Sequence, residues 1–463
     1  MSELPSGWQV TSLGEIGFVQ SGVGFPNEAQ GLTKGDYPVY KVGDVSRGVM
    51  QAKGNLSSAN NYVTKETAKK LKGYVFPNGS TLFAKIGEAL KLNRRAFVVR
   101  EGLADNNVMG FKADSGINDR LIYHFLRTQD LAAFSRSTTV PSIRKGDVEE
   151  LVVPLPPAAE QTRIAAKLDE LLAQVDTLKA RIDGIPALLK RFRQSLLAAA
   201  VSGRLTEEWR VKEVWLDERN QTLAPAQVSP MSWLRQTLPE LGELARGKSK
   251  HRPRNDARLF GGKHPFIQTG EVSNSAGVIK TAKIFYSDFG LEQSRLFPKG
   301  TLCITIAANI ADTAILGIEA CFPDSVVGFV ADNEKCRAQF VKYLIDVNKQ
   351  NLEAFAPATA QKNINLKVLS ELVFPMPPLS EQTEIVRRVE QLFAFADQLE
   401  ARVKAAQARI DHLTQSILAK AFRGELVPQD PNDEPASVLL ERIKAQRAAA
   451  PKAKRGRRAA TPS

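Results

Sequence analysis

Two long segments of the chain carry the same repeating pattern of apolar positions, in which steps of four residues alternate with steps of three. This spacing is typical of the seam of a coiled coil. Corresponding positions are separated by the same number of residues throughout, so neither segment has an insertion relative to the other. The predicted seams consist of Ile164, Leu168, Leu171, Val175, Leu178, Ile182, Leu189, Phe192 and Leu196, and of Ile385, Val389, Leu392, Leu399, Val403, Ile410, Leu413 and Ile417.

Each repeating segment begins with a proline-rich sequence that separates it from the residues before it. The first reads Pro-Leu-Pro-Pro-Ala-Ala-Glu-Gln-Thr at 154–162, and the second reads Pro-Met-Pro-Pro-Leu-Ser-Glu-Gln-Thr at 375–383. The second segment has neither Gly nor Pro between Glu381 and Arg423, which predicts a helix of about 60 Å. In the first segment, Asp-Gly-Ile-Pro at 183–186 predicts a kink or break near Ile182.

The residues between these segments predict two compact domains that share one framework. Short runs of β-forming residues alternate with turns that contain Gly and Asn, and one amphipathic helix is expected at 119–134. Trp8 and the run 38–46 return as Trp233 and the run 265–273, with an offset that varies along the chain. We therefore predict an α+β fold with two β-rich domains that have the same scaffold and different loops.

The expected order of parts follows from these boundaries. It comprises a first domain at 1–153, a central helix at 154–205, a linker at 206–230, a second domain at 231–374, a distal helix at 375–426 and a C-terminal segment at 427–463. A duplicated unit usually pairs with its own copy through a pseudo-two-fold axis. A parallel helix pair would force the short linker back along the whole rod, so we predict an antiparallel coiled coil with a globular domain at each end.

The balance of charge favours a nucleic-acid partner. The formal net charge is +13, and seven basic residues lie in the tail from Lys444 onward, which has no acidic residue and is expected to be disordered. The rest of the chain is still positive, which attracts a polyanion. Three unclustered cysteines without a Cys-x-x-Cys sequence argue against a zinc site or a disulfide framework, and we expect a cytoplasmic protein because no apolar leader or membrane-length run is present.

One motif points to a different class of protein. Residues 242–249 match the Gly-x-x-x-x-Gly-Lys-Ser pattern of a phosphate-binding loop, which would indicate a nucleotide hydrolase. That chemistry requires a buried strand before the loop and a helix after it. The preceding residues are polar, and a proline follows at Pro253 without an apolar period. The hydrolase therefore stays an alternative interpretation, as does a coiled-coil scaffold with two protein-binding heads.

The duplicated domains, the duplicated helices and the Pro-x-Pro-Pro-x-x-Glu-Gln sequence at both junctions resemble the specificity subunit of type I restriction–modification systems. Local sequences at 301–311, 424–427 and 434–443 agree with this resemblance. It implies two target recognition domains, each of which reads one half of a split, asymmetric site in double-stranded DNA. It also implies that the helices set the spacing and dock two methyltransferase subunits, to which two restriction subunits that translocate DNA can be added.

The same resemblance implies that the chain itself is not an enzyme and holds no catalytic residue, metal or cofactor. S-adenosylmethionine, ATP and Mg²⁺ would bind to the partner subunits. By this resemblance, the DNA-binding candidates are Lys, Arg, Asn, Gln and Ser side chains of the two domains, because these residue types contact phosphates and base edges. They are Lys41, Arg47, Lys85, Lys91, Arg94, Arg95, Ser142, Arg144 and Lys145 in the first domain, and Lys248, Lys250, Arg252, Arg254, Gln268, Asn309, Gln361, Lys362 and Asn363 in the second.

Overall fold

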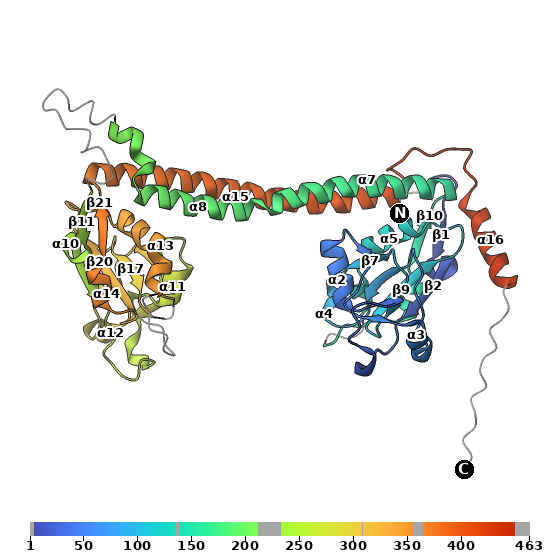
Figure 1. Cartoon of the computed structure of the whole chain (residues 1–463), viewed down its shortest axis with the longest axis horizontal. Coiled ribbons are helices and arrows are strands. Elements are labelled where there is room, and N and C mark those ends of the chain that lie inside the picture. Colours follow the sequence, from blue (N-terminus) through green and yellow to red (C-terminus); the bar gives the residue numbers. More distant parts are fainter. Residues whose placement is uncertain (1–3, 136–138, 212–232, 308, 355–363, 450–463) are drawn as a thin grey trace, which may run out of the picture. The chain divides into compact units, whose positions relative to one another are not determined.

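The chain divides into two compact units (Figure 1). Unit 1 contains residues 1–183 and 405–463, and unit 2 contains residues 184–404. Each unit combines one globular head with part of the long helices; head 1 covers residues 4–155 and head 2 covers residues 233–376. The structure is a computed structural model that describes residues 4–135, 139–211, 233–307, 309–354 and 364–449.

Head 1 is built on a five-stranded sheet with the strand order β2-β9-β6-β7-β4. Neighbouring strands are antiparallel except for β4, which runs parallel to β7. A second sheet has the order β5-β3-β8, and β1 pairs with β10, so the first and last strands of the head are joined. The strands are β1 (Gln9–Ser12), β2 (Gly17–Ser21), β3 (Tyr37–Tyr40), β4 (Asn55–Leu56), β5 (Tyr62–Val63), β6 (Thr81–Ala84), β7 (Arg95–Val98), β8 (Leu103–Ala104), β9 (Val108–Ala113) and β10 (Val152–Leu155).

Helices cover the sheets of head 1. The amphipathic helix expected at 119–134 forms as α5, but it ends at Thr128 and a separate 3₁₀ turn follows, because the Asp130 side chain accepts the N–H of Ala132 at 3.0 Å and starts a new turn. The Asn118 side chain caps α5 by accepting the N–H of Leu121 at 3.1 Å. The helices are α1 (Leu13–Ile16), α2 (Val42–Gln51), α3 (Lys65–Leu71), α4 (Glu88–Lys91), α5 (Asp119–Thr128) and α6 (Lys145–Glu149), with 3₁₀ turns η1 (Asn27–Ala29) and η2 (Leu131–Phe134).

Head 2 repeats this topology with one additional strand. Its five-stranded sheet has the order β12-β20-β17-β18-β14, its second sheet has the order β15-β13-β19-β16, and β11 pairs with β21. The additional strand is β16, at the edge of the second sheet. The strands are β11 (Leu234–Thr237), β12 (Gly242–Arg246), β13 (Phe260–Phe266), β14 (Val278–Ile279), β15 (Ile284–Tyr286), β16 (Leu296–Phe297), β17 (Leu302–Thr305), β18 (Thr313–Leu316), β19 (Ala320–Cys321), β20 (Val326–Ala331) and β21 (Val373–Met376).

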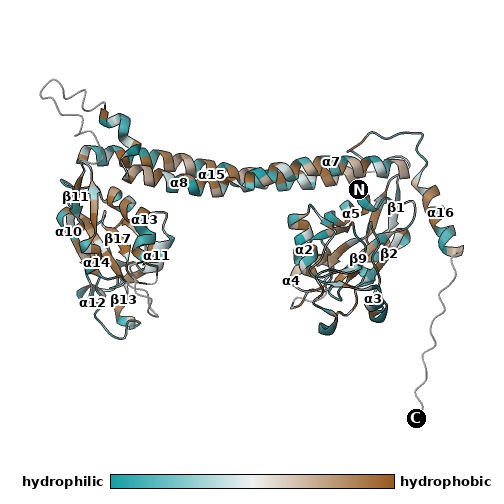
Figure 2. Ribbon diagram, in the orientation of Figure 1, coloured by the Kyte–Doolittle hydropathy of each residue, from teal (hydrophilic) through white to brown (hydrophobic). Residues whose placement is uncertain are grey.

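Each helix of head 2 occupies the place of a helix of head 1 in the order of elements, whereas α4 and η2 of head 1 have no counterpart among the described residues of head 2. They are α10 (Leu238–Leu241), α11 (Thr269–Asn274), α12 (Asp288–Glu292), α13 (Ala338–Ala354) and α14 (Leu366–Glu371), with the 3₁₀ turn η6 (Ala257–Leu259). Hydrophobic residues are concentrated on the inner strands of each head, as the brown colour of β9 and β17 shows (Figure 2). Both β6 and β17 are buried along their whole length. The duplication predicted from the sequence is therefore a duplication of the α+β framework, with differences at individual short elements.

Three helices connect the heads. The first repeating segment forms α7 (Ala158–Asp183) and α8 (Ile185–Val201), and the second forms one continuous helix of 44 residues, α15 (Leu379–Phe422). The predicted break is present between α7 and α8. Gly184 nevertheless keeps helical dihedral angles (φ −76°, ψ −21°). The break therefore reflects the missing backbone N–H of Pro186, which cannot donate a helical hydrogen bond. Within the part of the chain that the structure describes, no helix is long and apolar enough to cross a membrane.

The helices pair in opposite directions within each unit. In unit 1, Ile164 near the start of α7 packs with Leu418 near the end of α15, and Lys179 further along α7 donates to Asp411 of α15 at 2.6 Å. In unit 2, Leu196 near the end of α8 belongs to the same core as Ile385 near the start of α15. The antiparallel direction predicted from the sequence is therefore present in both units, whereas regular coiled-coil packing along the whole seam stays a prediction.

The predicted seam residues differ in burial. Those that are buried are Ile164, Leu168, Val175, Leu189, Leu196, Ile385, Val389, Val403 and Ile410. Those that are half-buried are Leu171, Ile182, Leu392, Leu399 and Ile417. Leu178, Phe192 and Leu413 are exposed, which contradicts their assignment to a buried stripe.

Two physical effects explain these differences. A straight helix drifts by about 20° per heptad from a strict seven-residue repeat, so a seam cannot stay buried over many turns without supercoiling. Near head 1 the buried face is also shifted by one residue. Leu172 and Leu418 are buried there in place of Leu171 and Ile417, because Trp8 of the head packs into the same cluster.

The C-terminal segment forms a helix on head 1 that the sequence did not predict. α16 (Ala436–Ala449) buries Leu439, Leu440 and Ile443 against the core of head 1, and Arg447 donates to Gly14 O at 2.7 Å. Residues 444–449, expected to be disordered, are therefore helical because the head covers their apolar neighbours, while 450–463 lie outside the described residues. The linker expected at 206–230 begins with helical residues at 207–211, and 212–232 also lie outside that part.

Candidate nucleic-acid interface

Each head is attached to its long helix by the same side-chain contact. In unit 1 the indole N–H of Trp8 donates to Glu160 Oε2 at 2.9 Å, and in unit 2 the indole N–H of Trp233 donates to Glu381 Oε2 at 3.1 Å. These two glutamates belong to the repeated Pro-x-Pro-Pro-x-x-Glu-Gln sequence. The motif therefore fixes the start of each helix against the first strand region of its head, a role that the sequence alone did not reveal.

The glutamine of the motif strengthens this attachment. Gln161 accepts the N–H of Asn118 at 2.9 Å and donates to Pro156 O at 2.9 Å. Gln382 accepts the N–H of Arg337 at 2.9 Å and donates to Pro377 O at 2.9 Å. Because buried amides that make several backbone hydrogen bonds are costly to remove, the two junctions hold their heads rigidly on the helices.

The two junction glutamates differ in their remaining contacts. Glu381 also accepts the Thr206 hydroxyl at 2.7 Å and forms a buried ion pair with Arg210. Glu160 is equally buried, but in the described part of the chain its Oε1 has no hydrogen-bond partner. Burial raises the pKa of the Glu160 carboxyl above its ordinary value.

The structure brings several candidates of head 1 together after the end of β6. Ile143 donates its N–H to Lys85 O at 3.0 Å, and Gly87 donates its N–H to Pro141 O at 2.8 Å. The loop after β6 therefore lies beside the residues that begin α6. Ser142, Arg144 and Lys145 are exposed in this region and Lys85 is half-buried, so four candidates form one polar surface, in which Lys145 also forms an ion pair with Glu149 at 3.4 Å.

Other candidates of head 1 are engaged by the protein itself. Arg47 forms an ion pair with Asp44, and Lys91 donates to Glu88 Oε1 at 2.7 Å. Arg94 is half-buried. These side chains can still contact a phosphate. The charges of Arg47 and Lys91 are partly neutralised by a carboxylate, and Arg94 is partly covered by the protein.

Arg95 does not belong to the interface, which corrects the prediction from the sequence. Its side chain is 3% exposed and donates to Leu126 O at 3.2 Å and to Gln129 O at 3.1 Å, so it closes the end of α5. Burial lowers the pKa of the guanidinium to about 10. Arg95 is a core residue that satisfies backbone carbonyls.

Replacement of Arg95 by glutamine is expected to lower the free energy of unfolding by about 1–3 kcal/mol, because the carbonyls of Leu126 and Gln129 lose the hydrogen bonds of the buried guanidinium. Thermal unfolding of the full chain measures this change. Arg94→Gln, next to it and half-buried, is the matched control and should change stability by less than about 0.5 kcal/mol. Equal effects of the two replacements, or an altered DNA sequence preference with Arg95→Gln at unchanged stability, would contradict the structural role.

The described candidates of head 2 lie on the loop after β12, at the start of α11 and on the loop after β17. Lys248, Lys250 and Arg252 are exposed on the loop after β12, and the Arg252 guanidinium donates to Ser249 O at 2.6 Å. Arg254 forms an ion pair with Asp324 at 3.0 Å. Arg254 and Gln268 line one cavity of about 240 Å³. This loop and the start of α11 therefore form a polar surface. The remaining candidates, Gln361, Lys362 and Asn363, lie outside the described residues.

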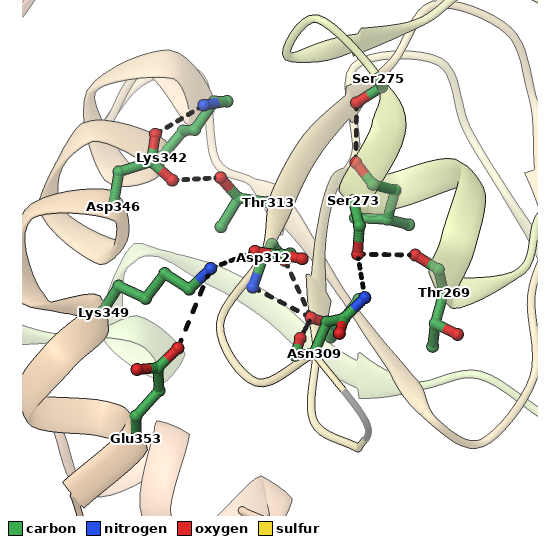
Figure 3. A network of polar contacts seen from close by, with 12 residues as sticks. Thr269, Ser273, Ser275, Asn309, Asp312, Thr313, Lys342, Asp346, Lys349 and Glu353 are labelled. Carbon is green, nitrogen blue, oxygen red and sulfur yellow. Dashed lines mark hydrogen bonds and ion pairs between the residues drawn. The ribbon is translucent and has the colours of Figure 1, made fainter. Parts of the chain in front are cut away.

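Asn309 belongs to a polar network beside this surface (Figure 3). Its amide donates to the Ser273 hydroxyl of α11 at 2.9 Å. Behind it, Asp312 forms an ion pair with Lys349 of α13, and Lys342 donates to Asp346 at 2.6 Å. The sequence identified Asn309 but missed Ser273, because serines are common and only the fold brings this one beside Asn309.

Residues 242–249 do not form a phosphate-binding loop. The first five of them are β12, which pairs along its whole length with β20 at the edge of the five-stranded sheet. A phosphate-binding loop instead requires backbone N–H groups that converge on a ligand at the start of a helix. The hydrolase interpretation is therefore wrong for this segment. Among the described residues no cluster of three or more His, Cys, Asp or Glu side chains could hold a metal ion.

Comparisons with known proteins agree on one family. The model of the type I restriction modification DNA specificity domain matches residues 5–187 and 233–406. The specificity subunit of the type I restriction enzyme EcoDI from Escherichia coli is 33% identical, with 96% of this chain and 97% of that chain covered. The specificity subunit of EcoBI from the same species is 31% identical, with 96% and 93% covered.

Solved structures share the fold. A chain from a study of complex assembly and conformational transition of the type I R-M system superposes with a TM-score of 0.70 at 21% identity, covering 92% of this chain and 100% of that chain. The HsdS subunit from Thermoanaerobacter tengcongensis superposes with a TM-score of 0.57 at 20% identity, covering 91% of this chain and 98% of that chain. The two duplicated heads and the long helices are thus features of a fold found in solved structures.

Proposed function

The chain belongs to the type I restriction–modification DNA specificity family, and we propose that each of its heads reads one half of a split DNA site. Two observations support this proposal. The heads repeat one topology, apart from the additional edge strand β16 of head 2. Their equivalent loops carry different side chains, since Lys85 and Lys91 follow β6 whereas Asn309 follows β17. One scaffold with two different surfaces is what an asymmetric, bipartite site requires.

The continuous helix α15 would set the length of the unread gap between the half-sites. It spans 44 residues without an interruption, which corresponds to a length of about 66 Å at about 1.5 Å per residue. Such a length covers about two turns of duplex DNA at about 34 Å each. The Trp–Glu contacts at both junctions would transmit this spacing to the heads, because they fix each head on its helix.

Two methyltransferase subunits would dock on equivalent positions of the helices. Phe192 and Leu413 correspond in the repeat and are 38% and 46% exposed, although large apolar side chains are normally covered. An exposed apolar residue that occurs once in each copy suits two identical partners. The methyl donor, ATP and Mg²⁺ would be bound by partner subunits, and this chain would supply recognition without catalysis.

Replacement of Phe192 and Leu413 by glutamate should weaken methyltransferase binding by about tenfold or more, because a carboxylate would be buried against an apolar partner surface. Co-purification and titration with the methyltransferase subunit measure the loss. Phe395→Glu is the matched control, since Phe395 is 54% exposed but corresponds in the repeat to the polar Gln174. A larger effect of the control than of the double variant would contradict docking at these positions.

A genome-wide map of N6-methyladenine in the host and in a strain that lacks the gene tests the proposed function. We expect a split motif with a constant unread gap that disappears in the deletion strain. Purified complex provides the second measurement: it should prefer duplexes that contain this motif over duplexes with one altered half-site. Binding without any sequence preference would reject the recognition role and favour a scaffold with protein-binding heads.

A further inference from the structure

One side-chain position is built identically in the two heads but is occupied by different residues. Lys41 immediately precedes α2 with φ −94° and ψ 169°, and Gln268 immediately precedes α11 with φ −101° and ψ 167°. The N–H of Lys41 donates to Asp44 Oδ2 at 2.9 Å, and the N–H of Gln268 donates to Glu271 Oε2 at 3.0 Å. The same backbone geometry directs both side chains in the same way from their helices.

The surrounding strands are equivalent as well. In head 1 this position follows β3, which pairs in parallel with β8, and in head 2 it follows β13, which pairs in parallel with β19. A rigid sheet therefore precedes the position and a helix follows it in each head. The backbone of this position is the same in both heads while the chemistry of its side chain differs, and this is the property expected of a residue that gives two copies of one fold different specificities.

Both side chains are available to a ligand. Gln268 is exposed and borders the cavity of about 240 Å³ next to Arg254. Lys41 donates to Gln30 Oε1 at 2.8 Å and lies 5.0 Å from the centre of the Phe25 ring. An ammonium group has three N–H donors, so this contact holds the group in place and leaves donors for a second partner.

Neighbouring basic candidates are less suited to reading a base. Arg47 is paired with Asp44, and Arg254 is paired with Asp324. Their charges are partly neutralised and their donors are partly used. These arginines fit contacts to phosphates, which position a protein on DNA without selecting a sequence.

We infer that Lys41 and Gln268 are equivalent base-reading residues, with Lys41 selecting guanine in one half-site and Gln268 selecting adenine in the other. This inference rests on the proposed function. The major-groove edge of guanine presents two acceptors, O6 and N7, which match the donors of an ammonium group. Adenine presents the N7 acceptor and the N6 donor, which match the donor and the acceptor of one carboxamide.

Exchange of the two side chains tests the inference. The complete complex of the chain with its methyltransferase subunits is incubated with a library of duplex DNA, and bound duplexes are sequenced. Lys41→Gln should change the preference from guanine to adenine at one position of one half-site, by about tenfold in relative binding. Gln268→Lys should cause the reverse change in the other half-site, and in each variant the unaltered half-site serves as the internal control.

Two further variants distinguish base reading from a general effect of lost charge and from a disturbed fold of the head. Lys70→Gln removes an exposed charge from α3 of the same head and should leave both half-sites unchanged. Lys41→Arg keeps several donors and should keep the preference for guanine. The inference is overturned if Lys41→Gln binds DNA with the wild-type preference at every position, or if Lys41→Arg and Lys41→Gln lose the half-site equally. Absence of any sequence preference in the wild-type complex would instead reject the proposed function.

Discussion

Glu381→Gln is expected to lower the free energy of unfolding by about 3–5 kcal/mol, because it leaves the buried guanidinium of Arg210 without its counter-charge. An amide also cannot accept from Trp233, Thr206 and Arg210 with equal strength, since one of its two polar atoms is a donor. Thermal unfolding of the full chain should show a transition lowered by roughly 10 °C. The loss should be confined to unit 2, where all four residues lie.

Glu160→Gln is the matched control, with the opposite expectation. The carboxamide oxygen can still accept the Trp8 indole N–H, and the nearby Arg163 keeps its ion pair with Asp433 at 2.5 Å. Burial raises the pKa of Glu160 in the folded state, so its ionisation costs stability as pH rises above the ordinary carboxyl range. The variant should therefore unfold at the same or a higher temperature at pH 7, and this difference should disappear near pH 4. Equal losses in the two variants would contradict the distinct roles of the two glutamates.

Lengthening the paired helices by four residues should lengthen the unread gap in the DNA site while both half-sites stay the same. The insertion is placed after Ala405 in α15 and after Asp183 at the break between α7 and α8, so that both sides of the pair grow. Four helical residues add about 6 Å. This length corresponds to between one and two base-pair steps of about 3.4 Å. Sequencing of methylated DNA from cells that express the variant measures the gap.

The control for this experiment is the insertion in α15 alone. Four residues turn a helix by about 40° more than one full turn, and the unpaired insertion would displace apolar residues from their partners. We therefore expect weaker assembly with the single insertion than with the matched pair. An altered half-site with an unchanged gap would contradict the role of α15 in spacing.

The sequence predicted the parts of the fold that depend on repetition and on local chain stiffness. The duplication of the heads could be read from matching runs such as 38–46 and 265–273, and the break at 183–186 could be read from Gly184 and Pro186. The burial of individual seam positions could not be predicted, since Leu172 is covered in place of Leu171 by the head that lies beside it. A pattern of apolar residues identifies one face of a helix and not what covers it.

The interface was harder to predict for a related reason. Arg95, Arg47 and Arg254 look alike in the sequence, but one closes α5 and the others are paired with Asp44 and Asp324. Partners such as Asp324, far along the chain from Arg254, become neighbours only through the fold. The equivalence of Lys41 and Gln268 was visible in the aligned runs, whereas their matching backbone geometry required the structure.

Unit 1 is assembled from both ends of the chain, and this has a consequence for synthesis on the ribosome. Residues 184–404 form unit 2 without a contribution from later residues, whereas unit 1 also requires 405–463. Head 1 is translated first, yet α16 covers its Leu13 and Ile16 cluster only after the last residues emerge. At about 5–20 residues per second, synthesis of residues 156–435 leaves that apolar surface uncovered for on the order of 15–60 s. Head 1 is therefore synthesised first but completed last. We expect chaperones to bind head 1 on the nascent chain until α16 has been made.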